Sequence, residues 1–319
     1  MKSLKNLKKI KGDASFREFY RNKKNKSIIV FSNKEKNKNL LIYDAINKIL
    51  IKNKIKAPKL ISQNYISRNI QIEDFGNTTV YQKIKRNKKK KLIYYKKIIK
   101  LLNSVQKIKT KRIKTFLGSI YKVPKYSKKI LLNEAKLFLD WYVPKKIKKK
   151  NQNLLKKKLI LVLKSLINKV EFSNQTFVHR DFHVSNLMIK NKKLCLIDSQ
   201  DAVFGNIAYD LASLIDDVRL KTSKRFKQDI FEEYIKTNKK MHIENFKNDF
   251  EILSVLRNLK IIGIFTRLSI RDKKHNYLKF IPYAWKLIEQ RTEKNKKFIE
   301  LKTILDKYFP QKKRSKYEN

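Results

Sequence analysis

The first part of the chain has short apolar runs separated by polar turns, a pattern that predicts strands over 16–21, 27–31, 61–66 and 70–73. The stretch 40–51 instead carries apolar residues at helical spacing, and Pro58 separates it from the next strand. We therefore expect a small α+β unit that ends near Gly76.

Beyond Gly76 the apolar spacing becomes that of long amphipathic helices, predicted over 78–108, 128–142, 151–170 and 207–308. One compact insert, 176–197, holds two short apolar runs around a polar loop. The fold class is thus α+β, with a small N-terminal lobe over 1–76 and a helical C-terminal lobe over 77–319.

Chain length and cysteine content indicate the size of the core and the redox environment of the protein. A chain of 319 residues buries a large core without disulfide or metal staples. The single Cys195 lies in an apolar run and cannot form an internal disulfide, so we expect a reduced, cytoplasmic protein. The basic amino terminus lacks the apolar core of a secretory signal, and Lys or Arg interrupts each long apolar stretch, including 252–270. No membrane span is expected.

The charge is strongly positive, with 80 Lys and Arg against 27 Asp and Glu. Such a chain attracts nucleic acid or anionic membrane, but charge alone supports only sequence-independent binding. Lysines occur along the whole length, and the runs 83–100 and 145–158 keep apolar residues at helical spacing. We interpret these runs as solvated helix faces and loops, and we expect no nucleic-acid partner.

The polar loop of the insert carries the candidate chemistry. Asp181 and Asn186 lie in the pattern H-x-D-x-x-x-x-N, and an apolar strand then ends in Asp198. In phosphoryl transfer one carboxylate orients the attacking hydroxyl, while a carboxylate and an amide oxygen hold the magnesium that bridges the nucleotide phosphates. The set predicts Asp181 as the catalytic residue, Asn186 and Asp198 as metal ligands, and ATP and Mg2+ as cofactors.

The histidines have other expected roles. His179 is interpreted as a packing and hydrogen-bonding residue of the catalytic loop. His183 is either an exposed loop residue or a substrate contact. His242 and His275 are isolated, and no Cys/His cluster has the spacing of a zinc site.

The catalytic loop resembles that of the aminoglycoside phosphotransferase and protein-kinase-like superfamily, and the resemblance covers most of the chain. A narrower resemblance is to the cell-wall amino-sugar kinases that phosphorylate the anomeric hydroxyl of N-acetylmuramate or N-acetylglucosamine. The segments that carry it are 12–17 with 20–21, 73–79, and 198–205 with 209–211. It implies a two-lobed kinase-like fold and a role in cell-wall recycling. In such a fold the N-terminal lobe, 1–76, binds the nucleotide, and the C-terminal lobe, 77–319, carries the catalytic and metal-binding loops.

The resemblance also implies nucleotide-binding residues. Gly12, Ser15 and Arg17 match the turn that covers the phosphates. Glu73 and Phe75 match the hinge whose backbone meets the adenine edge; their neighbours spell the metal-binding tripeptide of protein kinases, but too far upstream for that role. Asp210 matches a buried aspartate that anchors the following helix.

Candidate acceptor contacts are His183, Asp201, Glu134 and Trp141. The last two lie in 132–142, which resembles an acidic, aromatic helix near the sugar site, although its periodic Leu and Phe are also typical of a core. Two features depart from the kinase pattern. First, the strand 27–31 lacks the lysine that grips the phosphates, and 43–50 lacks its glutamate partner, so Lys34 or Lys36 is a candidate substitute for that lysine. Second, Ser199 stands where an aromatic residue usually follows the metal-binding aspartate.

Charge favours some acceptors over others. Polycationic aminoglycosides need several carboxylates, which this chain has in short supply, so a neutral or anionic amino sugar fits better. A choline-type acceptor would need an aromatic cage, which the sequence neither shows nor excludes. An inactive, basic nucleic-acid-binding scaffold is the alternative from another class, but it would have no need of Asp181, Asn186 and Asp198.

Overall fold

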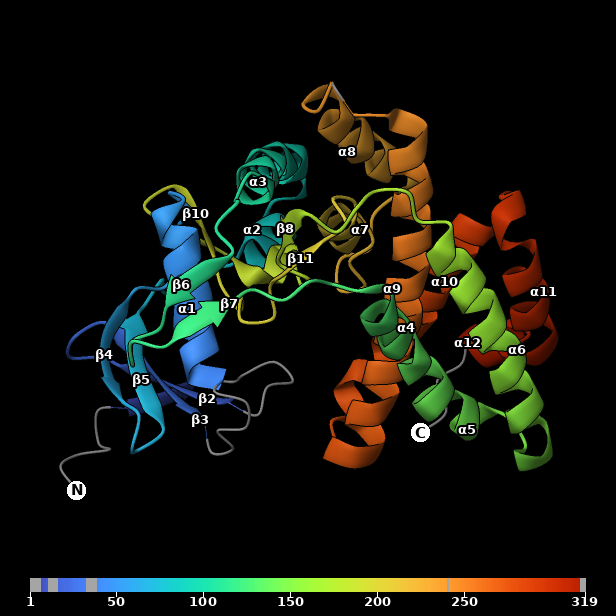
Figure 1. Ribbon diagram of the computed structural model, residues 1–319, viewed down its shortest axis with the longest axis horizontal. Coiled ribbons are helices and arrows are strands. Elements are labelled where there is room, and N and C mark those ends of the chain that lie inside the picture. Colours follow the sequence, from blue (N-terminus) through green and yellow to red (C-terminus); the bar gives the residue numbers. More distant parts are fainter. Residues whose placement is uncertain (1–6, 11–16, 33–38, 240, 316–319) are drawn as a thin grey trace. The chain divides into compact units, whose positions relative to one another are not determined.

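The computed structural model describes residues 7–10, 17–32, 39–239 and 241–315 (Figure 1). The chain divides into two compact units: unit 1 comprises 1–124 and 176–204, and unit 2 comprises 125–175 and 205–319. Unit 1 contains an antiparallel sheet and unit 2 is helical, which confirms the predicted α+β class. The lobe boundary after residue 76 remains a prediction made from the sequence.

In the described part of unit 1, a five-stranded antiparallel sheet has the order β1-β2-β3-β5-β4. Its strands are β1 (Leu7–Ile10), β2 (Arg17–Asn22), β3 (Ser27–Ser32), β4 (Leu60–Asn64) and β5 (Asn69–Glu73). The four strands expected from the sequence are confirmed within two residues at each end. β1 was not predicted, because its two central lysines leave it too few apolar positions.

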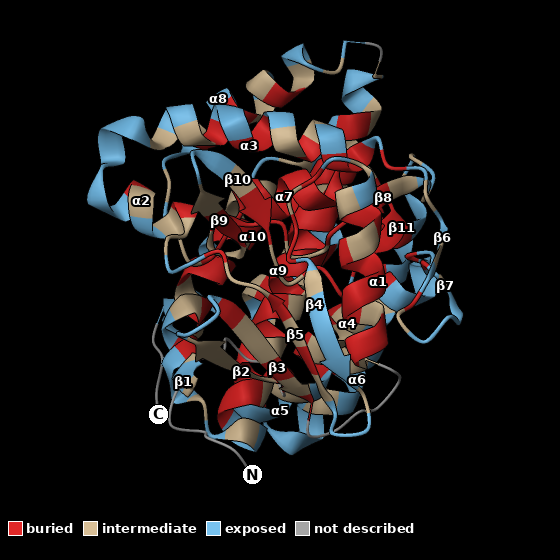
Figure 2. Ribbon diagram, turned by 90° about the vertical axis from the view of Figure 1, so that its left-hand side faces the viewer, coloured by how far each residue is buried: buried red, intermediate tan, exposed pale blue. Residues whose placement is uncertain are grey.

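Helix α1 (Asn39–Lys52) is buried over most of its length, as Figure 2 shows. Leu40 and Tyr43 of α1 pack with Val30, Ile70 and Ile72 of the sheet, and this cluster forms the core of the strand region. Burying apolar side chains of this size stabilises each by about 1.5–3 kcal/mol relative to exposure. The sheet and α1 therefore hold one another in place.

The helix expected over 78–108 is divided. Thr79 and Gln82 form a capping box that starts α2 (Val80–Arg86), and Asn87 follows its last residue. The Asn87 side chain then caps the turn η3 (Lys88–Lys90), and α3 (Lys91–Gln106) follows. A hairpin of β6 (Arg112–Lys114) and β7 (Ile120–Lys122) comes next.

The insert supplies β8 (Thr176–Val178), η5 (Val184–Asn186), β9 (Leu187–Lys190) and β10 (Lys193–Leu196), and β11 (Val203–Gly205) follows it.

The remaining predicted helices are present in unit 2, but some of them are divided into shorter elements. Before the insert come α4 (Lys128–Leu137), the π-helical turn η4 (Phe138–Tyr142), α5 (Val143–Lys146) and α6 (Lys149–Asn168). After it come α7 (Tyr209–Ile215), α8 (Lys224–Lys236), α9 (Ile243–Asp272), η6 (His275–Phe280), α10 (Ile281–Thr292), η7 (Lys296–Phe298), α11 (Ile299–Tyr308) and α12 (Gln311–Ser315). Among the described residues, no helix combines the length and apolar character needed to cross a membrane.

Helix α9 passes very close to the end of α4. A Cβ atom added at Gly263 would lie 2.3 Å from the backbone carbon of Leu137 and 2.5 Å from the backbone nitrogen of Phe138. Only glycine allows this approach, because the clash would be with backbone atoms that cannot rotate away. The contact is made where α4 passes into η4.

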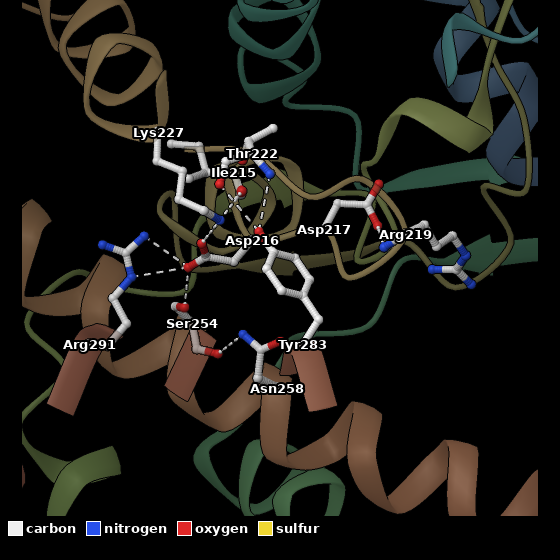
Figure 3. A network of polar contacts seen from close by, with 10 residues as sticks. All are labelled: Ile215, Asp216, Asp217, Arg219, Thr222, Lys227, Ser254, Asn258, Tyr283 and Arg291. Atoms are coloured by element: carbon white, nitrogen blue, oxygen red, sulfur yellow. Dashed lines mark hydrogen bonds and ion pairs between the residues drawn. The ribbon is translucent and has the colours of Figure 1, made fainter. Parts of the chain in front are cut away.

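A buried ion cluster joins four helices of unit 2 (Figure 3). Asp216, just after α7, accepts from Lys227 of α8 at 2.6 Å and from Ser254 of α9 at 2.5 Å. Arg291 of α10 donates to the same carboxylate at 2.9 and 3.1 Å. Burial acts to raise the pKa of Asp216, but the two cations outweigh it and hold the pKa below its ordinary value.

Candidate active site

The catalytic loop lies in unit 1 between β8 and η5, and local hydrogen bonds hold its shape. The side-chain Nδ2 of Asn186 donates to the backbone oxygen of Asp181 at 3.0 Å, and the backbone N–H of His183 donates to the same oxygen at 3.1 Å. Because the amide nitrogen of Asn186 is used within the loop, its Oδ1 is the atom presented for other ligands.

Two residues of this region have left-handed backbone conformations that residues other than glycine rarely adopt. Arg180 has a φ of 75°, and Asp198 has a φ of 61°. Such conformations cost of order 1–3 kcal/mol each and persist where the surroundings enforce them. Arg180 directly precedes the candidate base Asp181, and Asp198 is itself a candidate metal ligand.

Asp198 follows the strand β10 and is reached by a cation from β2. Its Oδ1 accepts from Arg17 Nη2 at 3.1 Å, yet 41% of its side chain remains exposed. Its partly enclosed position and the nearby Asp181 act to raise the pKa of Asp198, whereas Arg17 acts to lower it, and the net pKa is raised. The two carboxylates are therefore close enough to affect each other's ionisation.

Side chains behind Asp198 fix the position of its loop. The buried His179 forms a hydrogen bond through Nε2 with the backbone oxygen of Ile197 at 3.1 Å, which confirms its predicted packing role. Ser199 donates through Oγ to Oδ1 of Asn47 in α1 at 2.7 Å. This buried hydrogen bond anchors the loop to α1. Asn47 was not singled out from the sequence, although a polar residue inside an apolar helix was an available signal.

A pocket of about 410 Å³ opens beside Asn186 and Asp198. Its apolar lining includes Phe19, Ile28, Ile72, Phe75, Met188 and Ile197. Its polar lining includes Ser185, Asn186 and Asp198, together with Arg21, Glu73, Asn77, Thr79 and Gln82. The pocket thus combines apolar walls with oxygen ligands.

The segment 73–76, predicted from the sequence to be the hinge, is held by two cations that were not among the predicted site residues. Arg21 of β2 donates to both carboxylate oxygens of Asp74, at 2.5 and 3.0 Å, and to the backbone oxygen of Gly76 at 2.9 Å. Lys190 of β9 donates to Glu73 Oε1 and to the backbone oxygen of Asp74, both at 3.0 Å. A signal for Arg21 existed, since residues 17, 19 and 21 share one face of β2.

Phe75 offers a backbone edge at this pocket. Among the described residues, nothing pairs with its backbone N–H or C=O, although its side chain is nearly buried. Gly76 has a φ of 82°, and its N–H bonds to Asp74 Oδ1 at 2.7 Å, so the chain turns sharply after Phe75. A planar base with a donor and an acceptor at one edge would match this arrangement.

The other predicted site residues fall in several places. Gly12, Ser15 and the substitute lysines Lys34 and Lys36 lie outside the described residues. His183 is only 4% exposed, so the interpretation as an exposed loop residue is wrong, and the substrate contact remains a prediction. Asp201 is exposed and accepts from Gln200 Nε2 at 3.0 Å.

Glu134 and Trp141 belong to unit 2. Glu134 accepts from Lys260 at 2.9 Å and also from the Tyr126 hydroxyl. Trp141 is half-buried in η4. Both residues therefore take part in the internal structure of unit 2, and their contact with an acceptor stays a prediction.

The donor set fits the expected cofactors. A carboxylate and an amide oxygen are hard ligands that suit Mg2+, which usually completes its shell with water and phosphate oxygens. Asn186 and Asp198 would hold such an ion, and the ion would supply positive charge to the phosphates. The apolar lining that includes Phe75 suits an adenine ring, and Arg17 contacts the candidate metal ligand Asp198.

Comparison with known proteins places the chain in a family. A model of the phosphotransferase enzyme family, abbreviated APH, matches residues 6–242. The chain belongs to this family. The catalytic loop, the hinge and the Asp198 loop of the phosphotransferase all lie inside the matched range.

Curated relatives of the phosphotransferase carry the name N-acetylmuramate/N-acetylglucosamine kinase. The protein of Pseudomonas aeruginosa is 24% identical over 302 residues, which cover 92% of this chain and 86% of that protein. The protein of Neisseria meningitidis is 32% identical over 170 residues, which span half of each chain.

Solved structures share the fold at low sequence identity. An ethanolamine kinase of Plasmodium vivax has a TM-score of 0.59 at 16% identity and covers 91% of this chain and 83% of its own. The ADP-bound aminoglycoside phosphotransferase APH(2'')-Ib has a TM-score of 0.58 at 14% identity, with coverages of 89% and 92%. The predicted kinase-like fold is thereby confirmed.

Proposed function

We propose that this phosphotransferase uses ATP and Mg2+ to phosphorylate the anomeric hydroxyl of N-acetylmuramate or N-acetylglucosamine. The observation that carries the proposal is that Asn186 and Asp198 line one pocket together with several apolar side chains, in a chain whose curated relatives bear that name. The scarcity of acidic residues supports a neutral or anionic acceptor over a polycation.

The residues of unit 1 have distinct roles in this proposal. Asp181 orients the acceptor hydroxyl and accepts its proton. Arg17 neutralises charge near the phosphates in place of the absent strand lysine, since it already reaches the carboxylate of Asp198. The Asn186 hydrogen bond to the Asp181 backbone keeps the base and the metal ligand in one fixed loop.

The test is an acceptor panel incubated with ATP and MgCl2. The panel holds N-acetylmuramate, N-acetylglucosamine, their methyl glycosides with the anomeric oxygen blocked, choline and kanamycin. ADP release is followed by a coupled assay, and the product is identified by phosphorus NMR. We expect turnover with the two free sugars and none with the methyl glycosides.

Each alternative has its own signature in that panel. Phosphorylation of a methyl glycoside would place the reaction at another hydroxyl. Turnover with choline or kanamycin alone would show that the protein is a kinase whose acceptor is not an amino sugar. No turnover with any acceptor, together with tight, salt-sensitive RNA binding, would favour the inactive scaffold instead.

A further inference from the structure

The long helix α6 of unit 2 has two different faces. Its buried face carries Leu155, Leu159, Val162, Leu163, Leu166 and Ile167. On the opposite side, Lys150, Leu154, Lys157, Leu161 and Lys164 follow one another at spacings of four and three, so they form a single stripe along the helix. We call these five residues the α6 stripe; α6 can be followed in Figure 1.

Both leucines of the α6 stripe are more than half exposed. Leu154 is 54% exposed and Leu161 is 66% exposed. Single exposed apolar residues are common, but two that lie two helical turns apart on one line form an apolar ridge. No interaction within the described part of the chain covers this ridge.

The lysines around the ridge are not balanced by acids. Helix α6 contains six lysines and no Asp or Glu, and the sequence has no acidic residue between Asp140 and Glu171. Within the described residues, none of the six lysines forms an ion pair. Helix α8 mixes both signs, and α11 pairs Lys302 with Asp306 at 2.5 Å. Helix α3 also lacks acidic residues, but its exposed Leu92 and Ile93 are adjacent in sequence and therefore point in different directions. What sets α6 apart from these helices is that its exposed leucines and its lysines share one line.

We propose that the α6 stripe binds the surface of an anionic lipid bilayer. Lysines beside a lipid surface each contribute to attraction by acidic headgroups, and leucines between them enter the interfacial layer. The lysines of the stripe then contact acidic headgroups, and its leucines contact the apolar part of the interface. A second copy of this chain would meet like charge with like charge, and a nucleic-acid backbone would need the lysines but not Leu154 and Leu161.

The binding is peripheral and reversible. Two leucines bury far less apolar surface than an inserted amphipathic helix does, so the electrostatic part is the larger one and weakens with salt. The proposal does not depend on the identity of the sugar acceptor. Its consequence would be to concentrate the enzyme at the membrane surface.

The test is sedimentation of the full-length protein with vesicles. Equal parts of phosphatidylglycerol and phosphatidylcholine form the anionic sample, and phosphatidylcholine alone forms the neutral one. We expect binding to the anionic vesicles only. The triple change Lys150→Glu, Lys157→Glu and Lys164→Glu should weaken it by about tenfold or more. Leu154→Gln with Leu161→Gln should weaken it by about threefold at unchanged charge.

A matched control changes the same charge elsewhere. Lys23, Lys24 and Lys26 lie exposed in the β2–β3 turn of unit 1, and their change to Glu should leave most of the binding intact. Circular dichroism and thermal unfolding check that each variant is folded.

Three outcomes would overturn the proposal. The first is equal loss from both lysine triples with no effect of the leucine pair, which would mean that net charge alone drives binding. The second is absence of sedimentation with anionic vesicles at low salt. The third is binding to single-stranded RNA that needs the α6 lysines but not the leucines, without vesicle binding.

Discussion

At the scale of single residues, the candidate active site separates proton handling from metal and nucleotide binding. The backbone oxygen of Asp181 accepts a hydrogen bond from Asn186 within the loop. Asp198 instead pairs with Arg17 on β2 and lines the pocket. Removing one function should therefore leave the other measurable. Two variants make that distinction testable.

We expect Asp181→Asn to lower kcat by about a thousandfold while nucleotide binding is kept, because only the base is lost. Asp198→Ala should also weaken binding of magnesium-nucleotide, since it removes a metal ligand and the partner of Arg17. Steady-state kinetics and calorimetric titration of Mg-ADP give the two quantities. Wild-type kcat in Asp181→Asn, or unchanged Mg-ADP affinity in Asp198→Ala, would refute the respective assignment.

At the scale of secondary-structure elements, one glycine decides how closely α9 can approach α4. Helix propensity alone predicts that Gly263→Ala stabilises the protein by about 1 kcal/mol. The backbone of Leu137 lies 2.3 Å from the new Cβ, so we expect destabilisation by about 2 kcal/mol instead. Urea unfolding measures the free energy, and its sign distinguishes the two effects. A more stable variant would mean that the helices can separate at low cost.

The Asp216 cluster links four helices and should make the stability of unit 2 depend on pH. The pKa of Asp216 is lower in the folded protein than its ordinary value of 3.8, so its contribution is present above that value and is lost as pH falls through the folded pKa. Asp216→Asn leaves Lys227 and Arg291 buried without their carboxylate, and we expect a loss of about 3 kcal/mol at neutral pH.

Urea unfolding at neutral pH and below about pH 4 measures both effects. The wild type should lose more stability on acidification than Asp216→Asn does, because the variant has no carboxylate left to protonate at this position. Asp272→Asn provides the matched control, since Asp272 pairs with Arg271 on the surface and contributes little. Identical acid sensitivity of wild type and Asp216→Asn would show that the cluster does not govern the response.

At the scale of the whole molecule, the residues assigned to nucleotide and metal all lie in unit 1. Arg17, Phe75, Asn186 and Asp198 come from distant parts of the sequence but share that unit. We therefore expect Mg-ADP to slow hydrogen exchange in peptides of unit 1, namely 17–22, 72–79 and 184–199, and to leave α6 unchanged. Hydrogen-exchange mass spectrometry measures this directly.

Addition of the sugar should then protect peptides around 132–142, if Glu134 or Trp141 contacts the acceptor as the resemblance implies. Protection of 17–22 and 72–79 by the sugar alone, without nucleotide, would contradict the assignment of the pocket. The absence of any change at 132–142 would remove Glu134 and Trp141 from the acceptor contacts.

The sequence by itself determined the α+β class, the succession of strands and helices, and the catalytic loop, because these depend on spacing within a short stretch of chain. The hydrogen bond from Asn186 to the backbone of Asp181 spans five positions, so the local sequence determines the shape of this loop. Only the tertiary structure decided which distant side chains complete the site. Pairing within the sheet brings Arg21 to Asp74. Packing of more distant segments brings Arg17 to Asp198, and α1 packing brings Asn47 to Ser199. Such contacts depend on register and packing over the whole sheet, which no local pattern specifies.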